Sequence, residues 1–72
     1  MSLSCVIVDD SPGLVAAARS LLERQGLTIV GAASNCAEGL RLAAELRPDV
    51  ILVDVDLSGE SGFELARRLD QM

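Results

Sequence analysis

A short run of aliphatic and mostly β-branched residues occurs three times in this chain, and each run precedes a segment with helical spacing. The runs lie within residues 5–8, 27–33 and 50–53. The first run is typical of a strand that is buried on both faces of a sheet, and the third is also expected to be a buried strand. The alternation therefore predicts an α/β fold with the element order β-α-β-α-β-α and a parallel sheet.

Each predicted helix begins at a capping signal. The caps are Ser11 before Pro12, Asn35 with Glu38, and Ser61 with Glu64. Gly26 ends the first helix, and Arg47 ends the second because a residue before Pro48 is biased out of the α region. Residues 58–62 are expected to form a loop, and Phe63 is expected to pack in the core.

Right-handed crossover connections leave few ways to order the strands. If the second and third strands flank the first, the order is 2-1-3, and the first helix covers the face opposite the other two helices. The switch point between the first and third strands is where such sheets bind ligands, at the carboxyl ends of the strands. Asp9 and Asp10 end the first strand and Asp54 ends the third, so three carboxylates are expected to meet there.

The composition excludes several kinds of chemistry. The 72 residues carry a formal charge of −5 and include neither lysine nor histidine, so an imidazole base, a Walker lysine and a Schiff-base amine are all excluded. An acidic chain without a basic patch is not expected to contact nucleic acid. Without a long apolar run or a signal peptide, we expect a cytoplasmic protein that makes no membrane contact. Cys5 and Cys36 are expected to lie too far apart for a disulfide.

Three carboxylates at one point need a proton or a cation. Two unit charges about 5 Å apart repel by about 3 kcal/mol at an effective dielectric constant near 20. Mg²⁺ suits a site with few carboxylates, because it keeps water ligands and leaves room for a phosphoryl group. The alternative is that Asp9 and Asp10 only cap a turn, which leaves Asp54 without a role.

Five segments carry a family resemblance that covers nearly the whole chain. They are residues 6–12, 21–23, 30–34, 47–54 and 59–65. Together they resemble the receiver domain of bacterial two-component response regulators. The resemblance implies a flavodoxin-like fold of five β/α units. Residues 1–72 would form the first three of these units, as a partial receiver domain with no output domain.

The same resemblance assigns roles to the acidic residues. Asp54 corresponds to the phosphoacceptor, Asp9 and Asp10 to the pair that holds Mg²⁺, and the backbone carbonyl of Asp56 to a further metal ligand. The implied partner is a sensor histidine kinase, and the chain would not be an enzyme beyond self-catalysed phosphoryl transfer to Asp54. Receivers take a switch Ser or Thr and a phosphate-binding Lys from later strands, so we expect impaired phosphorylation here. Ser58 stands where receivers usually have proline.

Two other functions compete with this interpretation. Asp54-Val55-Asp56 after an apolar strand also resembles the haloacid-dehalogenase phosphatases, although their Asp-x-Asp normally ends the first strand. The other alternative is an interaction module that is not phosphorylated. Residues 50–53 would form an edge strand with unpaired backbone groups, so we expect self-association through the third strand.

Overall fold

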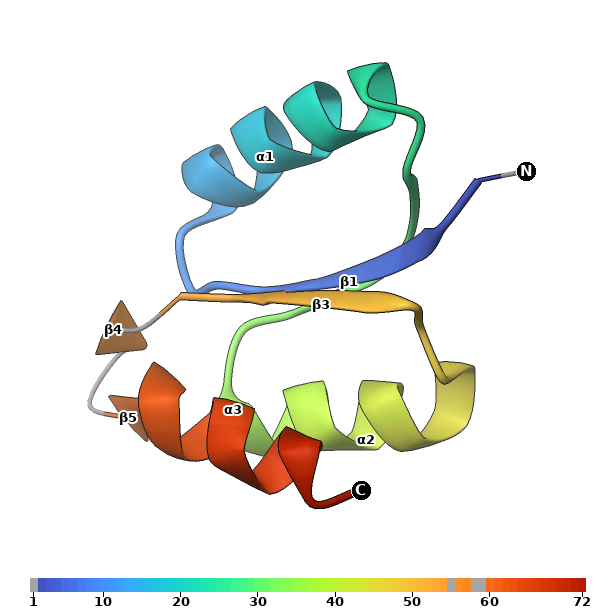
Figure 1. Cartoon of the computed structure of the whole chain (residues 1–72). Coiled ribbons are helices and arrows are strands. Elements are labelled where there is room, and N and C mark those ends of the chain that lie inside the picture. The colour runs from blue at the N-terminus through green and yellow to red at the C-terminus, as the bar shows by residue number, and fades with distance from the viewer. Residues whose placement is uncertain (1, 55, 58–59) are drawn as a thin grey trace.

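The computed structural model describes residues 2–54, 56–57 and 60–72. Its central sheet is parallel, in the order β2-β1-β3, and consists of β1 (Ser4–Val8), β2 (Thr28–Ala33) and β3 (Val50–Val53). Helix α1 (Pro12–Arg24) covers one face, and α2 (Cys36–Leu46) and α3 (Gly62–Asp70) cover the other (Figure 1). The predicted α/β class, strand order and placement of the helices are confirmed.

Local signals in the sequence set the helix boundaries. The Asn35 side chain accepts a hydrogen bond from the Glu38 amide at 2.9 Å, and the Ser61 hydroxyl accepts one from the Glu64 amide at 3.2 Å. Both predicted capping interactions are therefore present. Ser11 occupies the cap position of α1, but its hydroxyl makes no capping bond.

Two residues in the left-handed region end α1 and α2. Gly26 follows α1 with a φ of 92°, and its amide donates to the Glu23 carbonyl at 3.1 Å. Arg47 caps α2 with a φ of 45° directly before Pro48, a conformation that costs a side-chain-bearing residue about 1 kcal/mol. Both helices end where the sequence predicts.

The two neighbours of β1 pair with it differently. The register of β1 with β3 is continuous. On the other side, Cys5 pairs with Ile29 but Val6 pairs with Gly31, so Val30 is an extra residue in β2. This register shift is a β-bulge, which bends a strand and interrupts its regular hydrogen bonding.

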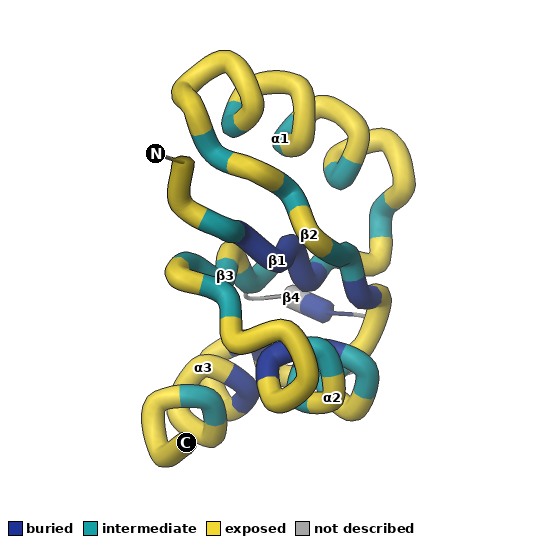
Figure 2. Tube along the Cα trace, turned by 90° about the vertical axis from the view of Figure 1, so that its right-hand side faces the viewer, coloured by how far each residue is buried: buried dark blue, intermediate teal, exposed yellow. Residues whose placement is uncertain are grey.

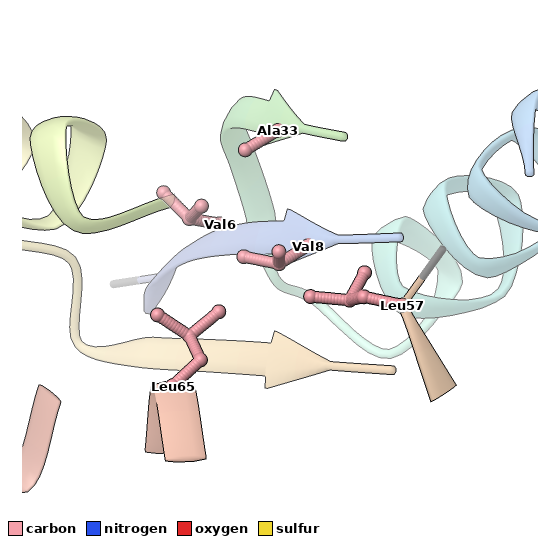
Figure 3. Close-up of a cluster of buried hydrophobic side chains, with 5 residues drawn as sticks. All are labelled: Val6, Val8, Ala33, Leu57 and Leu65. Carbon is pink, nitrogen blue, oxygen red and sulfur yellow. The ribbon is translucent and has the colours of Figure 1, made fainter. Parts of the chain in front are cut away.

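The core lies between the sheet and the α2/α3 layer. Figure 2 shows β1 buried along its length, whereas α1 is mostly exposed. The buried cluster, drawn in Figure 3, consists of Val6, Val8, Ala33, Leu57 and Leu65. Helix α2 approaches the sheet closely at Gly39, where a Cβ atom would lie 3.1 Å from a methyl carbon of Val8.

The opposite face of the sheet is less covered. No residue of α1, which is described throughout, is fully buried. Leu14 and Leu21 are 60% and 57% exposed on this helix, and Leu52 of β3 is 45% exposed. The prediction that β3 is a buried strand is therefore wrong for the face that carries Leu52, because α1 alone covers this side.

The segment after β3 differs from the predicted loop. Asp56–Leu57 form β4 and Glu60–Ser61 form β5, and the two strands pair antiparallel. Gly62 already belongs to α3. The loop predicted at residues 58–62 was therefore wrong for Glu60, Ser61 and Gly62, whereas Ser58 and Gly59 lie outside the described residues.

Phe63 does not pack in the core. Its side chain is 72% exposed, because the inward face of α3 carries Gly62, Leu65 and the half-buried Leu69 instead. These three residues have the spacing of one helix face, and Phe63 falls beside it. The prediction for Phe63 was wrong.

Cys5 and Cys36 are not joined by a disulfide, as predicted, and Cys5 is fully buried. Burial raises the pKa of the Cys5 thiol above its ordinary value of 9.0, and a hydrogen bond with the Leu52 backbone offsets part of this increase. A raised thiol pKa stabilises the folded state below the unfolded pKa, and this contribution is lost as the pH rises through the folded pKa. The chain has no lysine, tyrosine or histidine, so few groups other than its two thiols ionise in this pH range.

We therefore expect the free energy of unfolding to fall as the pH rises above about 9. Urea denaturation followed by circular dichroism between pH 7 and pH 11 would measure this. Cys5→Ala should be less stable at neutral pH, because it leaves a cavity, but should lose less stability in alkali. An equally steep alkaline loss in Cys5→Ala would contradict the assignment to Cys5.

Candidate metal centre

Three aspartates meet at the carboxyl end of the sheet, between β1 and β3. Asp9 and Asp10 follow β1, and Asp54 follows β3. One carboxylate oxygen of each lies within 4.8 Å of those of the other two. Asp9 and Asp54 are half-buried, whereas Asp10 is exposed. The structure thus brings together the three side chains that the sequence predicts to converge.

Strand pairing holds the backbone of two of these aspartates. The Asp54 amide donates to the Val8 carbonyl at 2.8 Å, and the Asp9 amide donates to the Ala33 carbonyl at 2.9 Å. Both bonds extend the parallel ladders one residue beyond the strands. The sheet therefore positions the backbone at the point from which each of these carboxylates projects.

Asp9 also shapes the turn into α1. Its Oδ1 atom accepts a hydrogen bond from the Ser11 amide at 2.9 Å, which is an Asx-turn. Asp9 therefore does cap this turn, as the alternative predicted, and the hydrogen bond uses one of its two carboxylate oxygens. This turn-capping role does not conflict with a metal-binding role for the other oxygen. It does not explain why Asp54, from a different strand, lies at the same point.

The donor set fits a hard divalent cation. Carboxylate oxygens are the ligands that Mg²⁺ and Ca²⁺ prefer, and the cluster contains no sulfur or imidazole donor of the kind that zinc favours. A site with three carboxylates, one of them exposed, leaves coordination positions for water, which suits Mg²⁺. Asp56 lies in β4, two residues after Asp54, and the role of its backbone carbonyl stays a prediction.

An open hollow of about 490 Å³ adjoins the cluster on the β2 side. Asp9 and Asp10 line it together with Arg19 of α1 and Glu38 of α2. It gives water and hydrated ions a path to the carboxylates. The position of Arg19 near the site was not predicted from the sequence. A signal was available, because Arg19 follows Pro12 by seven residues and the two therefore lie on the same face of α1.

Comparison with known protein families matches residues 5–72 to the response regulator receiver domain. The chain belongs to this family. The receiver is 41% identical over 66 residues to the transcriptional regulatory protein AfsQ1 of Streptomyces coelicolor, covering 92% of this chain and 29% of that protein. It is 40% identical over 67 residues to protein-glutamate methylesterase/protein-glutamine glutaminase 3 of Hahella chejuensis, covering 93% of this chain and 19% of that enzyme.

Solved structures agree with the receiver fold. The crystal structure of a two-component response regulator of the LuxR family from Aurantimonas sp. SI85-9A1 superposes with a TM-score of 0.91 at 33% identity, covering 99% of this chain and 51% of that chain. The receiver thus spans less than a third of either curated relative and about half of this solved chain. Among its described residues, no helix combines the length and apolar character needed to cross a membrane.

Proposed function

We propose that this receiver accepts a phosphoryl group on Asp54 in the presence of Mg²⁺. The observation that carries the proposal is the meeting of three carboxylates within 4.8 Å, at the sheet's switch point, in a chain of this family. Asp9, Asp10 and Asp54 would hold the ion with their side chains, and Asp56 with its backbone carbonyl. The proposed donor and partner is a sensor histidine kinase.

The proposed reaction uses few groups of the chain. A carboxylate oxygen of Asp54 forms a bond to phosphorus while the phosphorus–nitrogen bond of the donor breaks, and the leaving imidazole takes a proton from solvent. A carboxylate nucleophile needs no general base, so the absence of histidine is no obstacle. A bound divalent cation would offset the repulsion between the carboxylate and the phosphoryl oxygens. The ladder bond from the Asp54 amide to Val8 holds the nucleophile's backbone in place during the transfer.

We also propose that residues 1–72 alone are phosphorylated only weakly. They correspond to the first three of the five β/α units of a receiver, with no output domain among them. The family's switch hydroxyl and phosphate-binding lysine come from the later units, and these residues include no lysine. The segment would act as a cytoplasmic phosphoacceptor rather than as an enzyme, without direct contact to nucleic acid or membrane. By analogy with AfsQ1, its output would be transcriptional.

Intact-mass measurement after incubation with acetyl phosphate and Mg²⁺ tests the site. We expect a phosphoryl adduct on the unaltered protein and none on Asp54→Asn. Asp70→Asn, which removes an exposed aspartate at the end of α3, should be labelled like the unaltered protein. Labelling of Asp54→Asn to the same extent would refute the assignment. Repeated hydrolysis of a phosphate ester would instead favour the phosphatase alternative.

A second proposal concerns the edge strand β3. We infer that a polypeptide of these 72 residues self-associates through this strand, as an interaction module would. The support is its position at the edge of the sheet, its unbroken register with β1 and the 45% exposure of Leu52.

Light scattering over a wide concentration range tests this association. We expect the mass of a pair, which Leu52→Lys should reduce to that of one chain because a charged residue blocks strand pairing. Val30→Lys places the same charge at the β2 edge, where Val30 is 41% exposed, and should leave the mass unchanged. A single-chain mass at every concentration would count against the proposal.

A further inference from the structure

Leu57 has a fully buried side chain close to the carboxyl end of β3. It lies in β4, three residues after Asp54, and is 1% exposed. Figure 3 shows its side chain extending from β4 toward Val8 of β1. Its burial was not predicted from the sequence.

Val8 connects Leu57 to the aspartate cluster. It belongs to the same buried cluster as Leu57, directly precedes Asp9 in the chain, and accepts the Asp54 amide at 2.8 Å through its carbonyl. Asp54 and Leu57 are therefore both attached to the end of β1. A backbone hydrogen bond holds Asp54, and a buried side chain holds Leu57.

The antiparallel pair of strands β4 and β5 connects Leu57 to the start of α3. Leu57 pairs with Glu60, and Asp56 pairs with Ser61, whose hydroxyl caps α3. The backbone of Asp56 and Leu57 is thus paired with the residues that lead into α3.

We propose that Leu57 is a positioning residue for the metal centre. Burial of its side chain holds Leu57 and the neighbouring Asp56 against the end of β1, and with them the direction of the Asp56 carbonyl and the position of Asp54. The effect on the metal rests on the function proposed above. The effect on the backbone at Asp54 does not.

Leu65 provides a matched control for a purely structural role. It is the same residue type, is 0% exposed and belongs to the same buried cluster, but it comes from α3 and lies outside the segment that follows Asp54. If Leu57 served only to fill the core, Leu57→Ala and Leu65→Ala would have the same effects.

The experiment compares the two variants by two measurements. The first is Mg²⁺ affinity, determined by calorimetric or NMR titration with MgCl₂. The second is hydrogen exchange of the Asp54 amide relative to the Asp9 amide, which donates to Ala33 on the other side of β1. We expect Leu57→Ala to weaken Mg²⁺ binding about tenfold, the lower end of what outer-shell substitutions cost in metal affinity. It should also accelerate exchange at Asp54 relative to Asp9.

Leu65→Ala should lower the melting temperature by a similar amount while leaving the Mg²⁺ affinity and the exchange ratio unchanged. Equal changes in both variants, or no change in either, would overturn the positioning role. If Leu57→Ala does not fold, the milder Leu57→Val is expected to show the same pattern at smaller amplitude. If the unaltered protein binds no Mg²⁺, the proposed metal function fails. In that case the positioning role is tested by hydrogen exchange alone. If the ratio of the Asp54 to the Asp9 exchange rate is raised in Leu57→Ala, the role is supported, and if the ratio is unchanged, the role is overturned.

Discussion

In solution without divalent cations, Asp10→Asn is expected to raise the free energy of unfolding by about 1–2 kcal/mol. Three carboxylates lie within 4.8 Å of one another at the end of the sheet. Two unit charges at this separation repel by about 1 kcal/mol in water and by about 3 kcal/mol at an effective dielectric constant near 20. Asp10 is exposed, so the smaller repulsion energy applies to its interaction with Asp9 and to its interaction with Asp54. Asparagine keeps the size of the side chain and removes the charge.

Saturating Mg²⁺ should reverse this order of stability. A ligand that binds only the folded state stabilises it by about 2.7 kcal/mol at a concentration of 100 times its Kd. The unaltered chain should gain this amount, whereas Asp10→Asn, which would lack one of the proposed ligands, should gain less. Urea denaturation with and without MgCl₂, followed by circular dichroism, measures both effects.

Glu23→Gln is the control for the loss of one negative charge. Glu23 lies in the last turn of α1, whereas the aspartate cluster lies next to the first turn. Its response to Mg²⁺ should match that of the unaltered chain. If Asp10→Asn were less stable than the unaltered chain without divalent cations, mutual repulsion would not be the dominant effect at this cluster.

Gly39→Leu is expected to lower the free energy of unfolding by about 2–3 kcal/mol. A Cβ atom at Gly39 would lie 3.1 Å and 3.4 Å from the two methyl carbons of Val8 and 3.5 Å from a methyl carbon of Leu65. A leucine side chain has no room there without displacing α2 from the sheet, and overpacking typically costs about 1–3 kcal/mol. Thermal and urea denaturation would measure the loss.

Gly13→Leu makes the same substitution at a position where a side chain has room. Nothing lies within 4 Å of a Cβ atom built on Gly13, which is in the first turn of α1. Replacing a helical glycine there should stabilise the chain by up to about 1 kcal/mol. If Gly39→Leu were equally well tolerated, the close approach of α2 to β1 would not be needed for stability.

The main elements were predictable because their signals are local. Each capping residue acts within three positions of its helix start, as Asn35 does for Glu38. The convergence of the aspartates was predictable for a different reason, because parallel strands bring their carboxyl ends to one edge of the sheet.

The remaining features depend on contacts between distant segments. A strand of two residues has no periodicity to detect, so β4 and β5 were not predicted. The burial of Leu57 depends on Val8, which is far away in the chain. For α3, helical spacing allows both the pair Phe63 and Ala66 and the pair Leu65 and Leu69 to face inward. Packing against the core selects the second pair.

The bulge at Val30 makes the two edges of the sheet unequal. β3 presents an unbroken row of backbone donors and acceptors, whereas the row along β2 is interrupted where Val30 is inserted. In two chains joined through β3, the central sheet would end on both sides at a bulged β2 edge, which is a poor template for a further strand. Association would then stop at two chains instead of growing into a fibre.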